Sequence, residues 1–293
     1  MRIRQMLFCF ALLLLTGNTL HSQNFKADRF QASDFDTMST WELAKYDGLN
    51  MLKGVGFAYA RPFHWGKNDF IRVGATAGIV SGVFLVDEDL SNWARRNKND
   101  VPEIIRDFGW YFGSPQNNYG VTGAIYLTSL FSKNREWRRT GVLMISSATA
   151  GGVLQQFLKI AVGRARPETG KGKNEFRPFL NDSGYSSFPS GHTVLSFTTA
   201  YALAKHFENP WVKAGIYGVG LISPVSRIWS GAHYTTDVIL SLAVVIATVE
   251  GVDRYLDTRN GYGKKRYGSK RKDGKVNWTL QATSQTVGVS LRF

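Results

Sequence analysis

The chain has 293 residues, which is enough for one sizeable hydrophobic core or for one domain with appendages. It has 36 Lys and Arg against 22 Asp and Glu, and the resulting net charge of +14 favours a polyanionic partner such as anionic lipid, phosphate or nucleic acid. The single cysteine, Cys9, lies in the first apolar stretch, so a chain cleaved after that stretch has neither a disulfide nor a thiol nucleophile.

The N-terminus has the order of a secretory signal peptide. Two arginines precede an apolar run from Met6 to Leu15, and small and polar residues follow as far as Ser22. We therefore expect residues 1–22 to be a signal peptide cleaved after Ser22, with an uncleaved first membrane anchor as the alternative. Residues 23–69 are polar and aromatic with mixed periodicity, which predicts an N-terminal extracytoplasmic segment of short helices and loops packed on the main body.

Six apolar segments of helical length come next, and they are rich in the small residues that let helix backbones approach closely. They cover Phe70–Val86, Tyr119–Phe131, Gly141–Gly163, His192–Phe207, Trp211–Ser226 and Thr235–Leu256. The expected fold class is therefore all-α, with a six-helix bundle over residues 70–257. Residues 258–293 form a basic linker and a tail, and the alternation of apolar and polar residues from Val276 to Phe293 predicts one or two short β-strands in it.

A membrane span needs about 20 mostly apolar residues, and only Gly141–Leu158 comes near that length without a charge. A water-soluble bundle stays open, and the mean hydropathy of −0.19 agrees with it. If the last five segments span, the basic stretch Ser132–Arg139 and the basic tail after Arg254 fall on the same side, as the positive-inside rule asks. We favour this membrane arrangement, which places the loops after the third and fifth helices on the outside.

The first of these outside loops follows KIAVGRARP, residues 159–167. Lys159 and Arg166 are seven positions apart, so on a helix they would project from nearly the same face, and Pro167 would end that helix. Two cations on one face repel each other unless an anion lies between them. The alternative is a pair of side chains that snorkel at a membrane edge.

The fourth apolar segment begins with PSGH, and Ser190 and Gly191 are placed to start its helix. The free N–H groups and the positive dipole end of a helix can hold an oxyanion, and glycine lets the backbone come close to it. His192 in the first turn would lie beside that anion. An ordinary capped turn with a surface histidine is the alternative.

The fifth segment continues into SRIWSGAHYTTD, residues 226–237. His233 and Asp237 stand at i and i+4, the helical arrangement in which a carboxylate fixes the tautomer of a ring and raises the basicity of its other nitrogen. Arg227 is a third cation, suited to bidentate contact with phosphate oxygens. A metal site is disfavoured because two histidines and one aspartate come with two arginines and a lysine.

Together, the motifs K-x6-RP, PSGH and SR-x5-H-x3-D resemble the signature of the type 2 phosphatidic-acid phosphatase superfamily, which includes class A acid phosphatases and vanadium haloperoxidases. The resemblance covers residues 70 to about 256 and implies a six-helix bundle of that kind. It implies that His233 attacks phosphorus while Asp237 holds its ring, and that His192 protonates the leaving oxygen and later activates water. The phosphoryl oxygens would be bound by Lys159, Arg166, Arg227, the Ser190 hydroxyl and the Gly191 N–H, with no metal or other cofactor.

The substrate class stays open at this point. A lipid phosphate hydrolase would act on a phosphatidate-like lipid, an isoprenyl diphosphate or a lipid A phosphate, in the inner membrane of a bacterial cell envelope with a periplasm-facing site. The alternatives are a soluble periplasmic acid phosphatase of broad specificity and, ranked last, a vanadium-dependent haloperoxidase. Inorganic phosphate and vanadate are expected ligands of the site. Binding of phosphate-rich glycans or nucleic acid by the basic tail would explain the charge but not the paired histidines, so nucleic acid is not an expected partner.

Overall fold

The structure is a computed structural model, and it describes residues 30–31, 33–262, 277–282 and 287–292. The chain divides into two compact units, Met1–Gly263 and Lys264–Phe293, and each is described by itself. The expected signal peptide and the basic linker over residues 263–276 lie outside the described residues.

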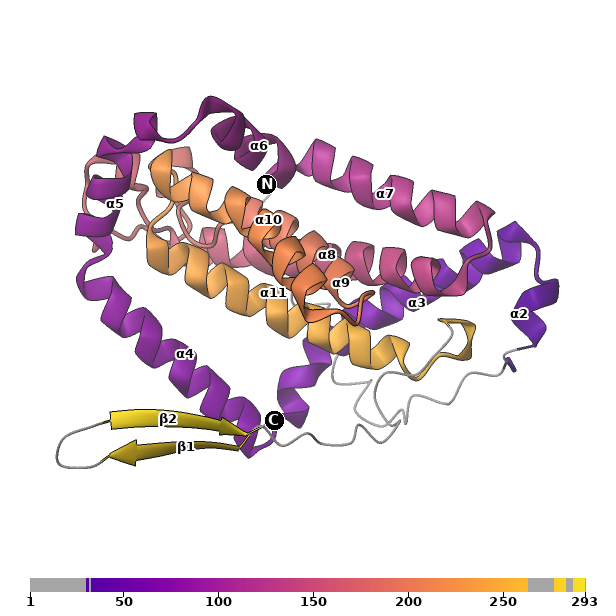
Figure 1. The fold of residues 1–293 in the computed structure, drawn as a ribbon. Helices are drawn as coiled ribbons and strands as arrows, with labels where there is room; N and C mark the ends of the chain where they lie inside the picture. Colours follow the sequence, from indigo (N-terminus) through magenta and orange to yellow (C-terminus); the bar gives the residue numbers. More distant parts are fainter. Residues whose placement is uncertain (1–29, 32, 263–276, 283–286, 293) are drawn as a thin grey trace. The chain divides into compact units, whose positions relative to one another are not determined.

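The first unit is helical (Figure 1). Its helices are α2 (Asp34–Thr37), α3 (Thr40–Ala60), α4 (Lys67–Leu85), α5 (Asp87–Arg96), α6 (Glu103–Gly113), α7 (Pro115–Phe131), α8 (Arg135–Val162), α9 (Gly191–Ala204), α10 (Pro210–Trp229) and α11 (Thr235–Leu256). Each of the six expected apolar segments is one of these helices. The prediction of a helical bundle is therefore confirmed.

Helix α3 corrects the expectation of short helices and loops before residue 70, because it is 21 residues long. Ser39 begins it with a capping box: its hydroxyl accepts from the Glu42 N–H, and the Glu42 carboxylate accepts from the Ser39 N–H. Its buried face is made largely of small and polar residues: Asp47, Asn50, Gly54 and Ala58 beside one leucine, Leu43. Such a face gives no apolar period of 3.6 residues, so the helix could not be recognised by hydrophobicity.

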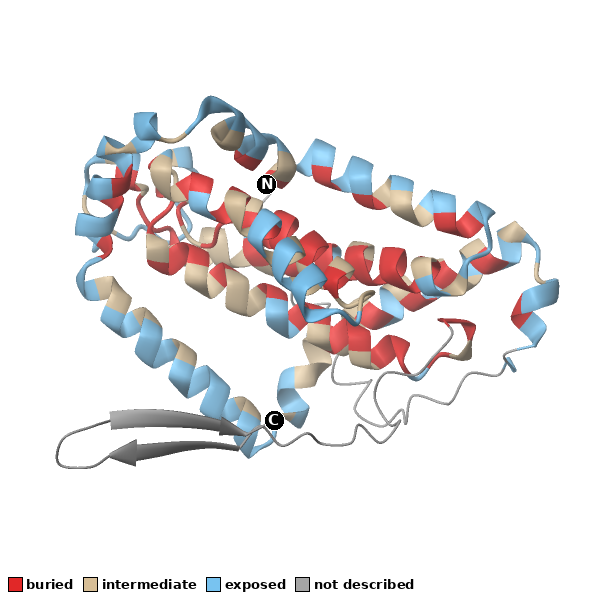
Figure 2. Cartoon of the chain, viewed as in Figure 1, coloured by how far each residue is buried: buried red, intermediate tan, exposed pale blue. Residues whose placement is uncertain are grey.

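The hydrophobic core lies where α8, α9 and α11 pack together, with α3 against α8 and α11 (Figure 2). Small residues bring these helices close: Gly151 of α8 faces Val194 of α9, and Gly251 of α11 faces Ala58 of α3. Figure 2 also shows that α4 is different, since it has no buried residue.

The basic stretch Ser132–Arg139 is an exposed loop only at its start, because α8 begins at Arg135 and two of its arginines are buried. Arg138 is fully buried, and its Nη2 lies 2.6 Å from an Asp47 carboxylate oxygen of α3. Arg139 is also buried and forms ion pairs with Asp253 and Asp257 at the end of α11. These charges are used inside the bundle, so they no longer support an orientation based on the positive-inside rule.

Two helices, α8 and α11, are long and apolar enough to cross a membrane. The pair α4 and α5, bent by 62°, would be a third span if it crosses as one broken helix. Helix α4 exposes several large apolar side chains, among them Phe70, Ile71 and Ile79. These helices indicate a membrane protein, whereas an arrangement with five spans stays a prediction.

The second unit contains a β-hairpin, as the alternating tail predicts. Strands β1 (Asn277–Ala282) and β2 (Val287–Arg292) pair antiparallel, with Asn277 opposite Arg292 and Ala282 opposite Val287.

Candidate active site

The residues of the three motifs come together at one end of the bundle, where α8 and α10 end and α9 and α11 begin. The Ser190 N–H at the start of α9 donates to Ser241 Oγ of α11 over 2.8 Å. The Gln155 amide near the end of α8 donates to the Pro189 carbonyl over 3.4 Å. These two bonds hold the start of α9 against α11 and against the end of α8.

The first motif does not lie on a single helix, as the sequence suggested. Helix α8 ends at Val162 because Gly163 has a left-handed backbone (φ 56°), and a Cβ there would lie 2.0 Å from the Arg177 carbonyl oxygen. Lys159 is in the last turn of α8, whereas Arg166 lies in the loop that follows. The Arg166 Nη2 donates to Ser186 Oγ over 3.0 Å. The loop, and not a common helical face, therefore positions the second cation.

The third motif needs a similar correction. Helix α10 ends at Trp229 and α11 begins at Thr235, so His233 lies in the turn between them and is not a helical i,i+4 partner of Asp237. Among the described residues, His233 has no hydrogen bond to Asp237. Instead, the Nδ1 of His233 contacts the Ser187 carbonyl oxygen.

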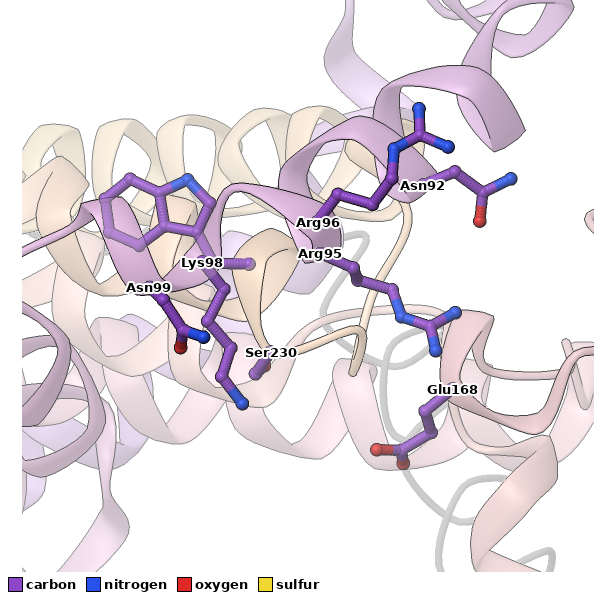
Figure 3. Close-up of a pocket in the computed structure, with 8 residues that line it drawn as sticks. Asn92, Arg95, Arg96, Lys98, Asn99, Glu168 and Ser230 are labelled. Carbon is purple, nitrogen blue, oxygen red and sulfur yellow. The ribbon is translucent and has the colours of Figure 1, made fainter.

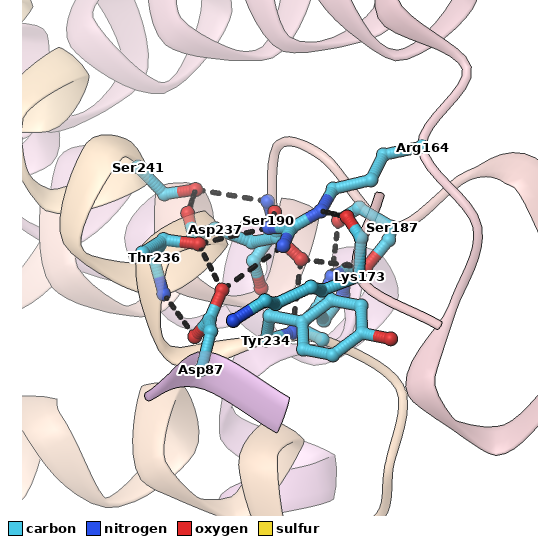
Figure 4. A network of polar contacts seen from close by, with 10 residues as sticks. Asp87, Arg164, Lys173, Ser187, Ser190, Tyr234, Thr236, Asp237 and Ser241 are labelled. Atoms are coloured by element: carbon cyan, nitrogen blue, oxygen red, sulfur yellow. Dashed lines mark hydrogen bonds and ion pairs between the residues drawn. The ribbon is translucent and has the colours of Figure 1, made fainter. Parts of the chain in front are cut away.

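Asp237 is bound elsewhere (Figure 4). Its carboxylate accepts from Arg164 Nη1 over 2.6 Å, from Ser187 Oγ over 2.6 Å and from the Tyr234 N–H over 2.9 Å. Asp237 is thus linked to the His233 ring through Ser187, which it holds by the side chain while the backbone carbonyl of Ser187 contacts the ring. The expected pairing of Asp237 with the ring is replaced by an indirect one.

The contact with Ser187 decides which nitrogen of His233 can react. A carbonyl oxygen only accepts hydrogen bonds, so Nδ1 must bear the proton, and Nε2 keeps its lone pair. Burial, together with the charges of Lys159 and Arg166, lowers the pKa of His233 well below its ordinary value. A neutral ring with a free Nε2 is the form that a nucleophile requires.

The second ring, that of His192, is in the first turn of α9. Its Nε2 is buried and has no hydrogen-bond partner in the described part of the chain. Burial first, and then the charges of Arg227, Lys159 and Arg166, lower the pKa of His192 to about 4. The same three cations therefore act on both rings. A buried ring nitrogen without a partner is uncommon and indicates a group that binds there.

The charges of these three cations are not balanced by buried carboxylates. By contrast, the buried arginines Arg138, Arg139 and Arg164 each have aspartate partners. Within the described ranges, Lys159 and Arg227 form no ion pair, and the ion pair of Arg166 is with the exposed Glu168, at 3.3 Å. Arg227 is buried, and Lys159 and Arg166 are partly buried. Because a cation withdrawn from water without a counter-ion is costly, this arrangement favours an anion at this end of the bundle.

The start of α9 agrees with the sequence prediction. Ser190 is the N-cap, and its Oγ accepts from the N–H and the hydroxyl of Thr193, over 3.4 and 2.9 Å, which leaves its own O–H as a donor. The Ser190 N–H is used by Ser241, so the Gly191 N–H is the backbone donor that remains for an anion.

Four further residues, which the sequence motifs did not indicate, support the site. Arg164 lies within the first motif and joins Asp237 to Asp87, over 2.6 and 3.0 Å, and Asp87 accepts from the Thr236 N–H over 3.1 Å. Ser187 holds the His233 ring. Trp110 of α6 packs against His192, with ring centroids 5.2 Å apart, and against Arg227 at 4.6 Å. The proximity of Arg164 and Ser187 to the motifs was a usable signal, but nothing in the sequence points to Asp87 or Trp110.

The sequence was also compared with known protein families. Residues 140–259 match the sequence model of the PAP2 superfamily. The resemblance to this superfamily that the motifs indicated is therefore confirmed over residues 140–259. All eight site residues that were proposed from the sequence lie inside the matched range. They are Lys159, Arg166, Ser190, Gly191, His192, Arg227, His233 and Asp237.

Individual proteins are similar to parts of this chain. The lipid A 1-phosphatase of Rhizobium etli is 36% identical over 107 residues, which cover 35% of this chain and 44% of that protein. The undecaprenyl-diphosphatase of Bacillus subtilis is 33% identical over 127 residues, which cover 43% of this chain and 63% of that protein. The chain thus spans less than half the length of the lipid A 1-phosphatase that it matches. A crystal structure of a transmembrane PAP2-type phosphatidylglycerolphosphate phosphatase from Bacillus subtilis aligns with a TM-score of 0.45 and 23% identity, covering 62% of this chain and 91% of that chain.

Proposed function

We propose that this protein is a metal-independent phosphatase that hydrolyses a phosphomonoester or diphosphate of a lipid through a phosphohistidine. The observation that best supports the proposal is the set of three cations without buried counter-ions, Lys159, Arg166 and Arg227, acting on two histidine rings. A phosphoryl group supplies the missing negative charge, and the cations stabilise the further charge that develops on its oxygens in the transition state.

The first step is phosphoryl transfer to His233. The lone pair on Nε2 attacks phosphorus, the N–P bond forms, and the bond from phosphorus to the ester or anhydride oxygen breaks. The leaving oxygen takes a proton from His192, whose buried Nε2 has no other described partner. Because the negative charge of the substrate opposes the three cations, we expect substrate binding to raise the pKa of His192 and so to protonate it.

The second step returns the enzyme to its starting state. His192 takes a proton from water, the water oxygen attacks phosphorus, and the N–P bond breaks to release inorganic phosphate. Ser187 keeps the proton on Nδ1 of His233 throughout, so the ring leaves as a neutral imidazole. The site residues provide the positive charge that other phosphoryl-transfer enzymes take from magnesium.

A lipid is the favoured substrate class because of the surface of the helical unit and because of the relatives. Helix α4 exposes large apolar side chains and buries none, as expected for contact with acyl chains. The relatives are named for lipid A 1-phosphate and undecaprenyl diphosphate, both phosphorylated lipids. We place the protein in the inner membrane of a bacterial envelope with the site facing the periplasm. The exposed apolar face of α4 favours this assignment over a soluble acid phosphatase.

The test is phosphate release by the full-length protein in detergent micelles, with a short-chain phosphatidate, an isoprenyl diphosphate and lipid A as substrates. We expect turnover of at least one lipid, inhibition by vanadate and full activity in EDTA. His233→Ala should abolish turnover and the acid-labile phosphoenzyme trapped by rapid quenching from labelled substrate. Normal rates in His233→Ala, or loss of activity in EDTA, would overturn the mechanism.

A further inference from the structure

A polar pocket of about 530 Å³ lies beside the phosphate site, between α5 and the loops that hold the first and third motifs (Figure 3). Arg95 and Arg96 at the end of α5, and Lys98 just after it, line one side. Glu168 and Ser230 line the other side, and Figure 3 shows the side chains of Arg95 and Lys98 extending toward them.

The pocket and the phosphate site share a wall. Glu168 lines the pocket, and its Oε1 accepts from Nη1 of the site residue Arg166 over 3.3 Å. The Glu168 N–H donates to the Gly231 carbonyl over 3.0 Å, two residues before His233. On the pocket side, Arg95 Nη1 donates to the carbonyl of Pro167 over 3.1 Å. A molecule bound at the phosphate site therefore has the pocket directly beside it.

The pocket also has an excess of positive charge. Three cations line it against one carboxylate, and that carboxylate already pairs with Arg166. Over the described residues, Arg95, Arg96 and Lys98 form no ion pair within 4.0 Å. Guanidinium and ammonium groups bind phosphate oxygens by charge-assisted hydrogen bonds, and both kinds line this pocket, although Figure 3 shows Arg96 pointing toward Asn92. Asn99 adds an amide donor at the same wall.

We propose that this pocket binds a second phosphate group of the substrate, in addition to the phosphate that is hydrolysed. The proposal rests on the proposed function and makes its substrate class more specific. The second phosphate has two possible sources: the inner phosphate of a diphosphate, or a separate phosphate on the same head group. Both bring the same chemistry, a phosphate monoanion or dianion held beside the reacting one.

The test is the double variant Arg96→Gln/Lys98→Gln, because neither side chain has a described hydrogen bond whose loss would disturb the fold. The substrates are a short-chain phosphatidate with one phosphate, an isoprenyl diphosphate and a lipid A bearing two separate phosphates. We expect KM to rise about tenfold for a substrate with a second phosphate, as loss of a charge-assisted bond requires, while kcat stays nearly constant. KM for the phosphatidate should stay within about twofold of the wild-type value.

Lys53→Gln/Lys67→Gln removes two exposed charges from α3 and α4 and is the matched control. A rise in KM for the diphosphate identifies the inner phosphate as the ligand, and a rise for lipid A alone identifies the separate phosphate. The proposal is overturned if KM is unchanged for both, or if phosphatidate and the control variant show the same rise, which would mean general electrostatic attraction. Failure of the wild-type protein to hydrolyse any of the three would instead contradict the proposed function.

Discussion

Two imidazole rings in the field of the same three cations define the site at the scale of single residues. Their different partners separate their roles: His233 is held by a carbonyl on one nitrogen, whereas the buried nitrogen of His192 has no described partner. Trp110 covers His192 and Arg227 together, although its own side chain is 53% exposed. The Trp110 ring therefore covers one side of the site and is itself partly exposed at the surface.

The pH dependence of kcat/KM follows from the lowered pKa of His233. A lowered pKa means that the ring takes up its inactivating proton only at a pH below the ordinary value of about 6.5. We expect the acidic limb of kcat/KM to lie below that pH. The three nearby cations act on both rings, and NMR titration of the histidines measures their effect. The pKa of His192, about 4 in the free protein, should rise when vanadate is added because the anion offsets these charges. If His192 or His233 titrates at 6.5 or above without ligand, the burial and the nearby cations do not lower its pKa as described.

Substitution of Trp110 tests whether its cover matters for chemistry. Trp110→Ala removes the ring from His192 and Arg227, admits water and weakens the electrostatic contacts, so kcat should fall about tenfold. Trp110→Phe keeps an aromatic face and should recover most of that loss. Wild-type kcat in Trp110→Ala would show that the cover has no role in the chemistry.

At the scale of elements, α6 lies against the site because it has glycine where it meets α9 and α10. A Cβ on Gly113 would lie 2.2 Å from Ser223 Oγ and 2.8 Å from Cβ of His192. A Cβ on Gly109 would lie 2.5 Å from Cβ of Ser226. The absence of a Cβ at these two glycines thus allows α6 to lie close to the His192 ring.

In Gly113→Ala, the new methyl group would clash with His192 of α9 and should displace α6 and the His192 ring from each other. We expect kcat to fall by about tenfold or more. Gly120→Ala is the matched control, because a Cβ there meets no atom within 4 Å and adds helix propensity to α7. Phosphate release and thermal unfolding of both variants are the measurements. Equal activities would show that α6 does not position the ring.

The helices of the site were predictable and the exact placement of two of its residues was not. Apolar segments of helical length gave α8 to α11, and the order of motifs gave the residues that meet at their ends. Arg166 and His233 were placed on helices because periodicity alone does not show where a helix ends. Gly163 and Gly231, with φ of 56° and 71°, turn the chain before each of them. The roles of Asp87 of α5 and Trp110 of α6 could not be predicted from sequence, because only tertiary packing brings these side chains to the site.

At the scale of the whole helical unit, ion pairs join the helices at both ends. Arg164 joins Asp87 and Asp237 at the site, and Arg138 with Asp47 joins α8 to α3 at the opposite end. The sequence showed these arginines only as positive charge, because a buried partner distant in sequence leaves no local signal. These arginines are buried together with their aspartate partners, so they add little to the exposed positive charge of the bundle.

Arg138→Leu should destabilise the protein strongly, because it leaves Asp47 buried without a counter-ion. We expect a loss of about 3–5 kcal/mol in the free energy of unfolding. Arg72→Leu removes a cation that is 75% exposed and 3.8 Å from Asp69, and it should change stability by less than about 1 kcal/mol. Thermal unfolding in detergent compares the two. Similar midpoints would show that the buried pair does not stabilise the bundle.

The bond from the His233 ring to a neutral carbonyl, rather than to a carboxylate, affects the two halves of the reaction in opposite directions. An imidazole without an anionic neighbour is less basic, and hence a somewhat weaker attacking group. Once phosphorylated, however, the same ring departs more readily, which favours rapid hydrolysis of the covalent species. We expect that species to stay scarce during steady turnover, with the enzyme resting mostly in its unmodified form.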